Sequence, residues 1–409
     1  MKRFPLAGIR ALDLSRILAG PLTAQALGDL GADVIKVERP GNGDEARRWG
    51  PPFLKDCHGE DTRESPMYLS ANRNKRSITV DLSTPAGRDI VTSLAARSDV
   101  VIENFKVGDL ARHGLDYDSI KAVRPDIIYC SITGFGQTGP YSRHPGYDSV
   151  FQAMSGLMSV TGLPDGLPGG GPMKTGPSIA DFIASQSATS AILAALYERD
   201  THSHEGQHID ISLLETTIAA QSHYVSTYLA TQVVPQRRGT EGNGGLPSQA
   251  FPCADRSIVV ICGSDAQYRQ LCEVLGHPAL ADDDRFRTNE RRLHHRAELA
   301  DTFAAVTRQW HSGPLLNALH RAGIPCAPIL DYEEVFSDPH VVDRGVAFLA
   351  DHALAGPVRF CASPIRYTGV KPRPPIAPPV LGQHTEQILL DELGLDSAAI
   401  QRLRDASVI

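Results

Sequence analysis

Strand-like and helix-like segments alternate through the first third of this sequence. Short runs rich in branched apolar residues are separated by longer stretches with helical spacing, such as Thr84 to Arg97. This alternation is typical of βαβ units, which build a parallel sheet with helices on both faces. We therefore predict an α/β fold whose large domain holds a doubly wound, Rossmann-like parallel sheet. Its predicted strands are residues 9–14, 33–37, 77–81, 99–103 and 126–131.

The character of the sequence changes twice after this alternation. A glycine-rich loop over residues 239–245 precedes a hairpin-like pair of strands and further helices, and a proline-rich tail from residue 357 then becomes helical. Changes of this kind mark domain boundaries. We predict a large domain over residues 1–221, a small α+β domain over residues 222–335, and a C-terminal segment over residues 336–409 that returns to the large domain.

Composition narrows the classes of partner. The longest apolar runs are strand-sized, and the N-terminal Met-Lys-Arg-Phe-Pro-Leu lacks the apolar core of a signal peptide, so we expect a cytoplasmic protein with no membrane partner. Seven cysteines without a Cys-x-x-Cys pair favour reduced, buried thiols, and we expect no metal. A formal net charge of −7 argues against a nucleic acid partner.

Distinctive segments follow the predicted strands, at the edge where a doubly wound sheet binds ligands. They are Ser15–Pro21, Glu38–Asp44, Asn104–Gly108 and Ile132–Gln137. A nicotinamide dinucleotide is one rival ligand, with Glu38 as its ribose-binding acid. The glycine fingerprint of such sites is missing, however, because only Gly20 lies in the first turn.

Positive charge is concentrated near the N-terminus. Residues 1–80 carry 13 Lys and Arg against 10 Asp and Glu, although the whole chain is acidic. This excess suits a small polyanion such as a nucleotide phosphate, and solvated surface charge is the alternative. The residues concerned include Arg39, Arg47, Arg48, Arg73, Lys75 and Arg76.

Asp181 stands alone at the head of a helix built from small and apolar residues, which extends to Tyr197. The unsatisfied N–H groups and the dipole of a helix N-terminus are expected to hold such a carboxylate ionised, so that it can act as a nucleophile. The same position also suits a helix cap. The local sequence allows both roles.

Eight further motifs occur in order along most of the chain. They are Leu12–Pro21, Leu30–Arg39, Asn72–Leu82, Val101–Phe105, Gly134–Gly136, Ile192–Leu196, Gly206–Glu215 and Leu381–Thr385. Together with Asp181, they give a sequence that resembles the class III CoA-transferases, also called the formyl-CoA transferase or CaiB/BaiF family. Each motif alone is weak, and the resemblance rests on their number and order.

The resemblance implies that Asp181 is the catalytic nucleophile and that the substrates are an acyl-CoA and a carboxylic acid, with no tightly bound cofactor. In the implied reaction, CoA passes from donor to acceptor through a covalent aspartyl-CoA thioester. An interlocked homodimer is also implied. The implied CoA-binding residues are Arg16, Ile17, Leu18, Ala19, Arg39, Asn104, Phe105, Arg112 and Phe135.

Two residues depart from the family pattern. Ser83 stands where relatives often place a lysine toward the CoA phosphates, which weakens one inherited phosphate contact. Leu18 replaces a glutamine that lies near the acyl group in the formyl-CoA enzyme. Because a very small acid such as oxalate needs polar partners, this replacement disfavours oxalate as a substrate.

The glycine-rich loop is the predicted lid over the site, with an ordinary surface loop as the alternative. Gly242, Gly244 and Gly245 permit positive φ angles and close backbone approach, and they leave N–H groups free to face an intermediate. A lid is needed because aspartyl intermediates hydrolyse readily. Arg237 and Arg238 flank the loop and suit the second carboxylate of a dicarboxylic acid.

Two other functions are weighed against CoA transfer. An α-methylacyl-CoA racemase of the same superfamily needs a second acid/base, typically a histidine in a Gly-His-Asp segment. The corresponding residues here are Gly146-Tyr147-Asp148, although His144 lies close by in the sequence. A non-catalytic CoA-binding protein is the second alternative.

Overall fold

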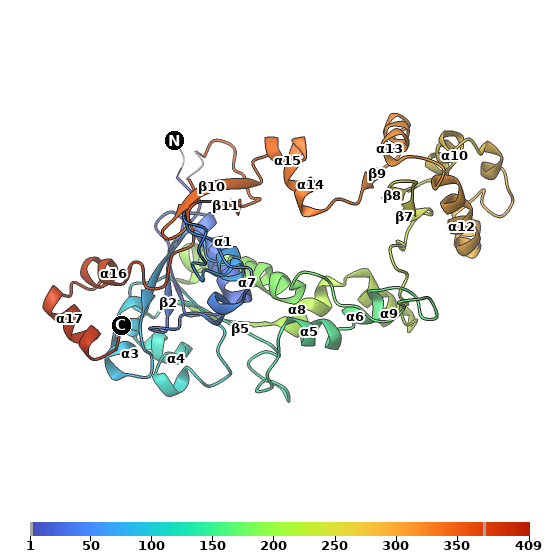
Figure 1. Cartoon of the computed structure of the whole chain (residues 1–409). Helices are drawn as coiled ribbons and strands as arrows, with labels where there is room; N and C mark the ends of the chain where they lie inside the picture. The colour runs from blue at the N-terminus through green and yellow to red at the C-terminus, as the bar shows by residue number, and fades with distance from the viewer. Residues whose placement is uncertain (1–2, 371–373) are drawn as a thin grey trace. The chain divides into compact units, whose positions relative to one another are not determined.

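The computed structural model of the chain describes residues 3–370 and 374–409 (Figure 1). Two compact units are present. The sequence assigned residues 158–173 to the large domain and 222–233 to the small one, whereas the contacts group each segment with the other unit. The large unit comprises residues up to 157, 174–233 and 342 onward, and the small unit comprises residues 158–173 and 234–341.

A six-stranded parallel sheet forms the centre of the large unit, in the order β3-β2-β1-β4-β5-β6. This order reverses direction between β1 and β4, which is where a doubly wound sheet opens a ligand-binding crevice. The predicted α/β fold with a parallel sheet is confirmed. The strands are β1 (Arg10–Asp13), β2 (Asp33–Glu38), β3 (Lys75–Thr79), β4 (Val100–Glu103), β5 (Ile128–Thr133) and β6 (Gln207–Ser212).

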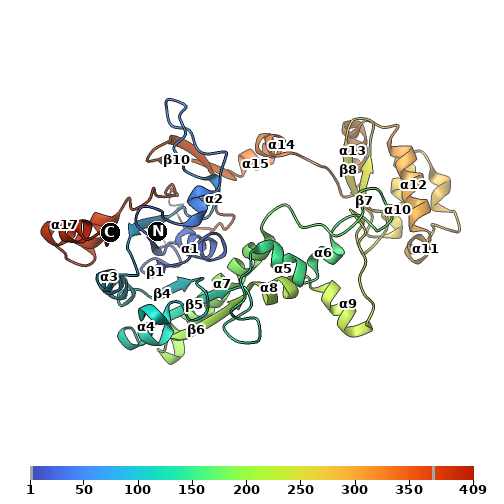
Figure 2. The same cartoon turned by 60° about the horizontal axis from the view of Figure 1, so that its bottom comes forward.

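Alternate residues of each strand point to opposite faces of the sheet, and both faces are buried. In β4, Val100 and Ile102 pack on one face and Val101 on the other. The first face is covered by α1 (Ala19–Asp29) and α7 (Ile179–Glu198), which lie side by side in Figure 1 and Figure 2. The second is covered by α3 (Pro85–Ala95), α4 (Tyr117–Val123), α16 (Thr385–Asp391) and α17 (Ser397–Asp405).

The C-terminal segment is joined to the large unit through backbone contacts with β3. The N–H of His384 donates to the carbonyl of Ser77 at 2.9 Å, and the N–H of Thr79 donates to the hydroxyl of Thr385 at 3.0 Å. A two-stranded antiparallel hairpin, which the sequence analysis missed, precedes these contacts. Its strands are β10 (Ala347–His352) and β11 (Gly356–Cys361).

The small unit contains an antiparallel sheet and a group of helices, as in an α+β domain. Strands β7 (Ser248–Pro252) and β8 (Ser257–Ile261) form the predicted hairpin, and β9 (Cys326–Pro328) pairs with β8. Phe251 and Phe303 are buried in its core. The helices of this core are α10 (Asp265–Val274), α11 (Asn289–His294), α12 (Arg296–Thr307) and α13 (Ser312–Arg321).

Shorter helices connect these elements. They are α2 (Pro66–Ser70), α5 (Asp148–Met154), α6 (Leu157–Val160), α8 (Leu213–Ala220), α9 (His223–Thr231), α14 (Tyr332–Ser337) and α15 (Pro339–Asp343). Among the described residues, one helical stretch, Ile179–Ser203, is long and apolar enough to pass for a membrane span. Its residues Ala184, Ala188 and Ile192 are fully buried against the sheet and α1, so the fold itself accounts for its apolar composition.

All seven cysteines are free, although they are not all buried as the composition suggested. Cys130, Cys262 and Cys272 are buried, whereas Cys57 and Cys361 are exposed. Across residues 3–370 and 374–409, no group of His, Cys, Asp or Glu side chains is arranged to hold a metal ion.

Candidate active site

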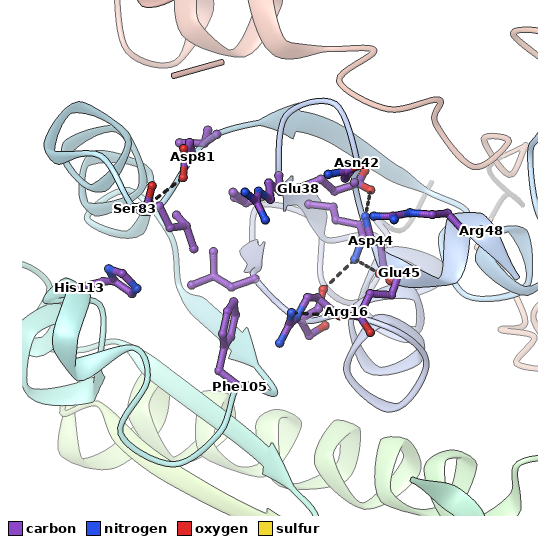
Figure 3. A pocket seen from close by; sticks show the side chains of 18 residues that line it. Arg16, Glu38, Asn42, Asp44, Glu45, Arg48, Asp81, Ser83, Phe105 and His113 are labelled. Atoms are coloured by element: carbon purple, nitrogen blue, oxygen red, sulfur yellow. Dashed lines mark hydrogen bonds and ion pairs between the residues drawn. The ribbon is translucent and has the colours of Figure 1, made fainter. Parts of the chain in front are cut away.

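A pocket of about 390 Å³ opens at the carboxyl ends of β1 to β4 (Figure 3). This is the edge of the sheet at which the sequence placed a ligand. The loops after the first two strands supply one part of the wall, and the segments after β3 and β4 supply the rest. Its lining side chains include Ser15, Arg16, Arg39, Asn42, Asp44, Glu45, Arg48, Asp81, Ser83, Phe105 and His113.

Arg39 and Arg48 supply positive charge to this pocket, whose lining also carries the carboxylates of Asp44, Glu45 and Asp81. Both line the wall, and neither forms an ion pair with a described residue. A guanidinium group in this state can bind a phosphate through two parallel hydrogen bonds. The other cations of the N-terminal excess are bound within the protein: Arg47 to Glu38, Arg73 to Asp29, Lys75 to Asp13, and Arg76 to Asp33 and Glu392.

Asn104 holds the loop that follows β1. Its side chain accepts a hydrogen bond from the N–H of Arg16 at 2.8 Å and donates to the carbonyl of Arg16 at 2.7 Å. The guanidinium of Arg16 lies 4.5 Å from the centre of the Phe105 ring, which lines the same pocket. Three predicted CoA-binding residues, from two loops far apart in sequence, are therefore in contact.

Asp181 lies in the first turn of α7, and the backbone N–H of Ala19, the first residue of α1, lies close enough to its carboxylate to favour the ionised form. Ala19 ends the loop that Asn104 holds. The structure thus joins Asp181 to the predicted CoA-binding segment Arg16–Ala19, although 162 residues separate Ala19 from Asp181 in the chain. No described residue forms an ion pair with Asp181.

Two expectations about Asp181 need correction. The helix is capped by Asp148, whose Oδ1 accepts the N–H of Ala180 at 2.8 Å, and not by the side chain of Asp181. The helix N-terminus also does not keep Asp181 strongly ionised. Burial and the nearby Asp148 carboxylate raise the pKa of Asp181 to about 7, against the opposing effect of the Ala19 N–H.

Asp148 is itself held in place from α5. The Gln152 side chain donates to its Oδ2 at 2.6 Å, and Oε1 of the same side chain accepts the N–H of Thr175 at 2.9 Å. Asp148 belongs to the segment in which a racemase would carry its histidine. Here Tyr147 is 62% exposed, and His144 stacks on Tyr141 with 5.0 Å between ring centres.

Glu38 does not have the surroundings of a ribose-binding acid. It is 4% exposed, and its carboxylate accepts hydrogen bonds from Arg47 at 2.7 Å, Ser77 at 2.7 Å and Tyr68 at 3.2 Å. Burial raises the pKa of Glu38, but Arg47 and Lys36 outweigh this effect and lower it below its usual value. The side chain is fully used within the protein, which argues against the dinucleotide site.

Other predicted CoA-binding residues lie outside the lining of this pocket. Arg112 is exposed and pairs with Asp109, while its neighbour His113 faces the pocket. Phe135 packs edge-on against Phe151. Leu18 is buried at 8% exposure. The CoA-binding roles of Arg112, Phe135 and Leu18 remain predictions.

In the small unit, the glycine-rich loop shows a close approach of its backbone to neighbouring groups, and one of its four glycines adopts a positive φ angle. The N–H of Gly242 donates to Ser248 O at 2.8 Å, and a Cβ added at Gly245 would lie 2.3 Å from Cys262 O. A positive φ occurs at Gly239 and not at Gly242, Gly244 or Gly245. Arg238 donates to the Asn243 side chain at 2.9 Å, and Arg237 pairs with Asp165.

Comparison with known proteins shows that most of the chain matches one family. The model of CoA-transferase family III matches residues 6–385. The chain is 42% identical to a succinate–glutarate CoA-transferase of Agrobacterium fabrum, over 95% of each chain, and 40% identical to the human succinyl-CoA:glutarate CoA-transferase, over 99% of this chain and 90% of that one. A crystal structure of a CaiB/BaiF family protein from Brucella suis is 41% identical, has a TM-score of 0.85, and covers 95% of this chain and 100% of that one.

Proposed function

Because this chain belongs to CoA-transferase family III and is therefore a CoA-transferase, we propose that it moves CoA between dicarboxylic acids, with succinyl-CoA as donor and glutarate as acceptor. The named activities of the two relatives described above support these acids. The observation that carries the proposal within the structure is Asp181, a half-buried carboxylate with no cationic partner among the described residues, close to the loop that walls a pocket lined by Arg39 and Arg48.

The proposed reaction begins at Asp181. Its carboxylate attacks the thioester carbonyl of the donor, the carbon–sulfur bond breaks, and a mixed anhydride and CoA thiolate result. The thiolate then attacks the aspartyl carbonyl and releases the donor acid, which leaves an aspartyl-CoA thioester. The acceptor carboxylate attacks this thioester to form a second anhydride, and the thiolate finally takes the acyl group of the acceptor and frees Asp181.

The Ala19 N–H is placed to assist this chemistry. When a nucleophile attacks the aspartyl carbonyl, negative charge develops on the carboxyl oxygen of Asp181, and the Ala19 N–H lies near this carboxyl group. A donor held at the oxygen where charge appears stabilises the transition state. Ala19 is also the first residue of α1, and the positive end of that helix favours the same charge.

CoA is proposed to bind in the pocket at the ends of β1 to β4. Arg39 and Arg48 are its phosphate contacts, because both guanidinium groups face the pocket without a carboxylate partner. Arg48 thereby supplies the charge that Ser83 lacks relative to other family members. Arg16 and Phe105, stacked together on the opposite wall, are the contact for the less charged part of CoA.

The second carboxylate of the acceptor is proposed to bind Arg238, which flanks the glycine-rich loop and pairs with no described acidic residue. The backbone of Gly242, Gly244 and Gly245 is proposed as a lid that excludes water from the aspartyl intermediates. The Arg238 assignment agrees with the dicarboxylic acids in the names of the relatives.

We also propose that two copies form the interlocked homodimer that the family resemblance implies. Exposed apolar side chains on and after α9 support an interface in the large unit: Tyr228 is 44% exposed, Leu229 is 68% and Val233 is 61%. Soluble monomers rarely expose apolar side chains in such a group. Light scattering after size exclusion should give twice the mass of one chain, and a monomer would contradict this assignment.

The racemase alternative is not favoured, because the named relatives are CoA-transferases and no histidine occupies the Gly146-Tyr147-Asp148 segment. A direct assay separates the functions. The protein, incubated with succinyl-CoA and glutarate, should form glutaryl-CoA and succinate, and Asp181→Asn should form neither. Exchange of an α-proton in 2-methylacyl-CoA without any transfer between acids would contradict the proposal.

A further inference from the structure

The loop after β1 carries an unusual backbone conformation at Ile17. Its φ angle is +70°, in the left-handed region that a β-branched side chain rarely adopts. Such a conformation persists only where the surroundings fix it. The neighbours of this loop should therefore show which groups hold it.

Side chains from two other loops and one strand bind backbone groups of Ser15, Arg16 and Ile17. Lys36 donates to the carbonyl of Ser15 at 2.8 Å, and Asn104 binds both backbone groups of Arg16. The N–H of Ile17 donates to Asp44 Oδ1 at 3.0 Å and to Oδ2 at 3.2 Å. Asp44 is thus the acceptor for the one residue of the loop whose φ angle is unfavourable.

Asp44 is fixed on its other sides. It is 2% exposed, its Oδ2 lies 3.0 Å from Lys36 Nζ, and its own N–H donates to Glu38 at 3.1 Å. Oδ1 also accepts the N–H of Ala46 at 2.9 Å and so caps the short 3-10 helix Glu45–Arg48. A carboxylate held on this many sides can set the position of the Ile17 N–H.

We propose that Asp44 is a positioning residue for catalysis: by accepting the Ile17 N–H, it fixes the loop that presents the Ala19 N–H to Asp181. Asp44 acts through this loop and does not itself contact the reacting atoms. Only Leu18 separates Ile17 from Ala19, so a shift of the first moves the second. The inference rests on the proposed acylation of Asp181.

Two substitutions separate this role from a structural one. Asp44→Asn and Asp44→Ser both remove the negative charge beside Lys36, and both keep a side-chain oxygen that can cap the 3-10 helix. Asparagine keeps the length needed to reach the Ile17 N–H, whereas the serine hydroxyl is one bond shorter. A difference between the two variants therefore reports the contact with Ile17. Asp396→Ser, at the cap of α17, is the matched control for an Asp-to-Ser change at a helix start.

The experiment measures single-turnover acylation of Asp181 by succinyl-CoA in each full-length variant, together with the Kd for CoA. Asp44→Ser should acylate roughly 10- to 100-fold more slowly than Asp44→Asn, the range expected for a misplaced catalytic group. The Kd for CoA should differ between them by less than about threefold, well below the change in rate. Asp396→Ser should match the wild type.

Equal acylation rates in Asp44→Ser and Asp44→Asn would overturn the inference, as would an equal loss in Asp396→Ser. If the wild type itself gives no Asp181 adduct, the proposed function fails instead, so the two failures are distinguishable. Hydrogen exchange of the wild type covers the case in which neither Asp44 variant folds. The Ile17 amide should then exchange as slowly as those of the core strands, and fast exchange would overturn the inference.

Discussion

The large unit contains two regions in which the charge of an aspartate is treated differently. Beneath the pocket, Asp13 and Asp44 are matched by Lys36 and Lys75, with Asp13 Oδ2 2.8 Å from Lys75 Nζ and Asp44 Oδ2 3.0 Å from Lys36 Nζ. At the start of α7, Asp181 meets another carboxylate and one backbone donor. The first region is a neutralised network, and the second leaves a negative charge uncompensated.

The pKa values follow from this difference. Burial raises the pKa of Asp13 and of Asp44, but their lysine partners outweigh it and lower both below the usual range. Burial raises the pKa of Asp181 as well, and there Asp148 adds to the effect. A buried carboxylate whose pKa is lowered by cations stabilises the fold, whereas one without a cation is a candidate for chemistry.

The largest expected effect is on catalysis at the unmatched aspartate. Asp181→Asn should reduce CoA transfer at least about 10⁴-fold, because the nucleophile is lost. The raised pKa of Asp181 lowers stability progressively between about pH 4, near the pKa of the unfolded chain, and about pH 7, and the full cost is present above pH 7. The free energy of unfolding of this variant, measured in urea at pH 8, should therefore be no lower than that of the wild type. A large fall in the free energy of unfolding would show that Asp181 stabilises the fold, as Asp13 and Asp44 do.

In the region where lysines neutralise the aspartates, a substitution should lower stability. Asp13→Asn leaves Lys75 and Lys36 buried with less compensating charge, and it should lower the free energy of unfolding by about 3–5 kcal/mol. Urea unfolding at pH 7 measures this change beside that of Asp181→Asn. A change below about 1 kcal/mol, the size typical of exposed ion pairs, would show that the buried network does not stabilise the fold.

A smaller effect is expected for the two pocket arginines without carboxylate partners. Arg39→Ala and Arg48→Ala should each raise the KM for acyl-CoA by about tenfold with little change in kcat, because each removes one phosphate contact far from the reacting atoms. Arg402→Ala, an exposed arginine of α17, removes the same charge and should leave KM unchanged. Equal KM values in all three variants would show that CoA does not bind in this pocket.

The smallest expected effect is on the pH dependence of acylation. The reactive form of Asp181 is the carboxylate and its pKa is about 7, so the acylation rate should rise about tenfold from pH 6 to a plateau above pH 8. Asp148→Asn keeps an oxygen for the Ala180 N–H but removes the charge that raises this pKa. Its profile should shift to lower pH, and an unchanged profile would assign the raised pKa to burial alone.

Strong local patterns made most of the fold predictable from sequence. The five predicted strands were recognised by short apolar runs, such as Val100–Ile102 in β4, because both faces of the sheet are buried. The sixth, β6 (Gln207–Ser212), was missed because its outer half is exposed and its sequence, Gln-His-Ile-Asp-Ile-Ser, is largely polar. The β10–β11 hairpin was missed because the proline-rich tail obscured the strand signal.

The site was only partly predictable, because its groups meet through long-range contacts. Motif order placed Asp181 and Arg39, but no local signal showed that Asp148 would cap α7 or that Ala19 would reach Asp181. The N-terminal charge excess pointed to six cations. Only the folded chain shows that Arg48 faces the pocket while its neighbour Arg47 is buried between Glu38 and Glu64.

The central claim, that Asp181 becomes acylated, can be tested by chemical trapping. The protein is incubated with succinyl-CoA, quenched with hydroxylamine and digested, and the peptide containing residues 176–197 is sequenced by mass spectrometry. The account predicts a hydroxamate on Asp181, and none on Asp148 or in the Asp181→Asn variant. Turnover of succinyl-CoA into glutaryl-CoA without a hydroxamate at Asp181 would contradict it.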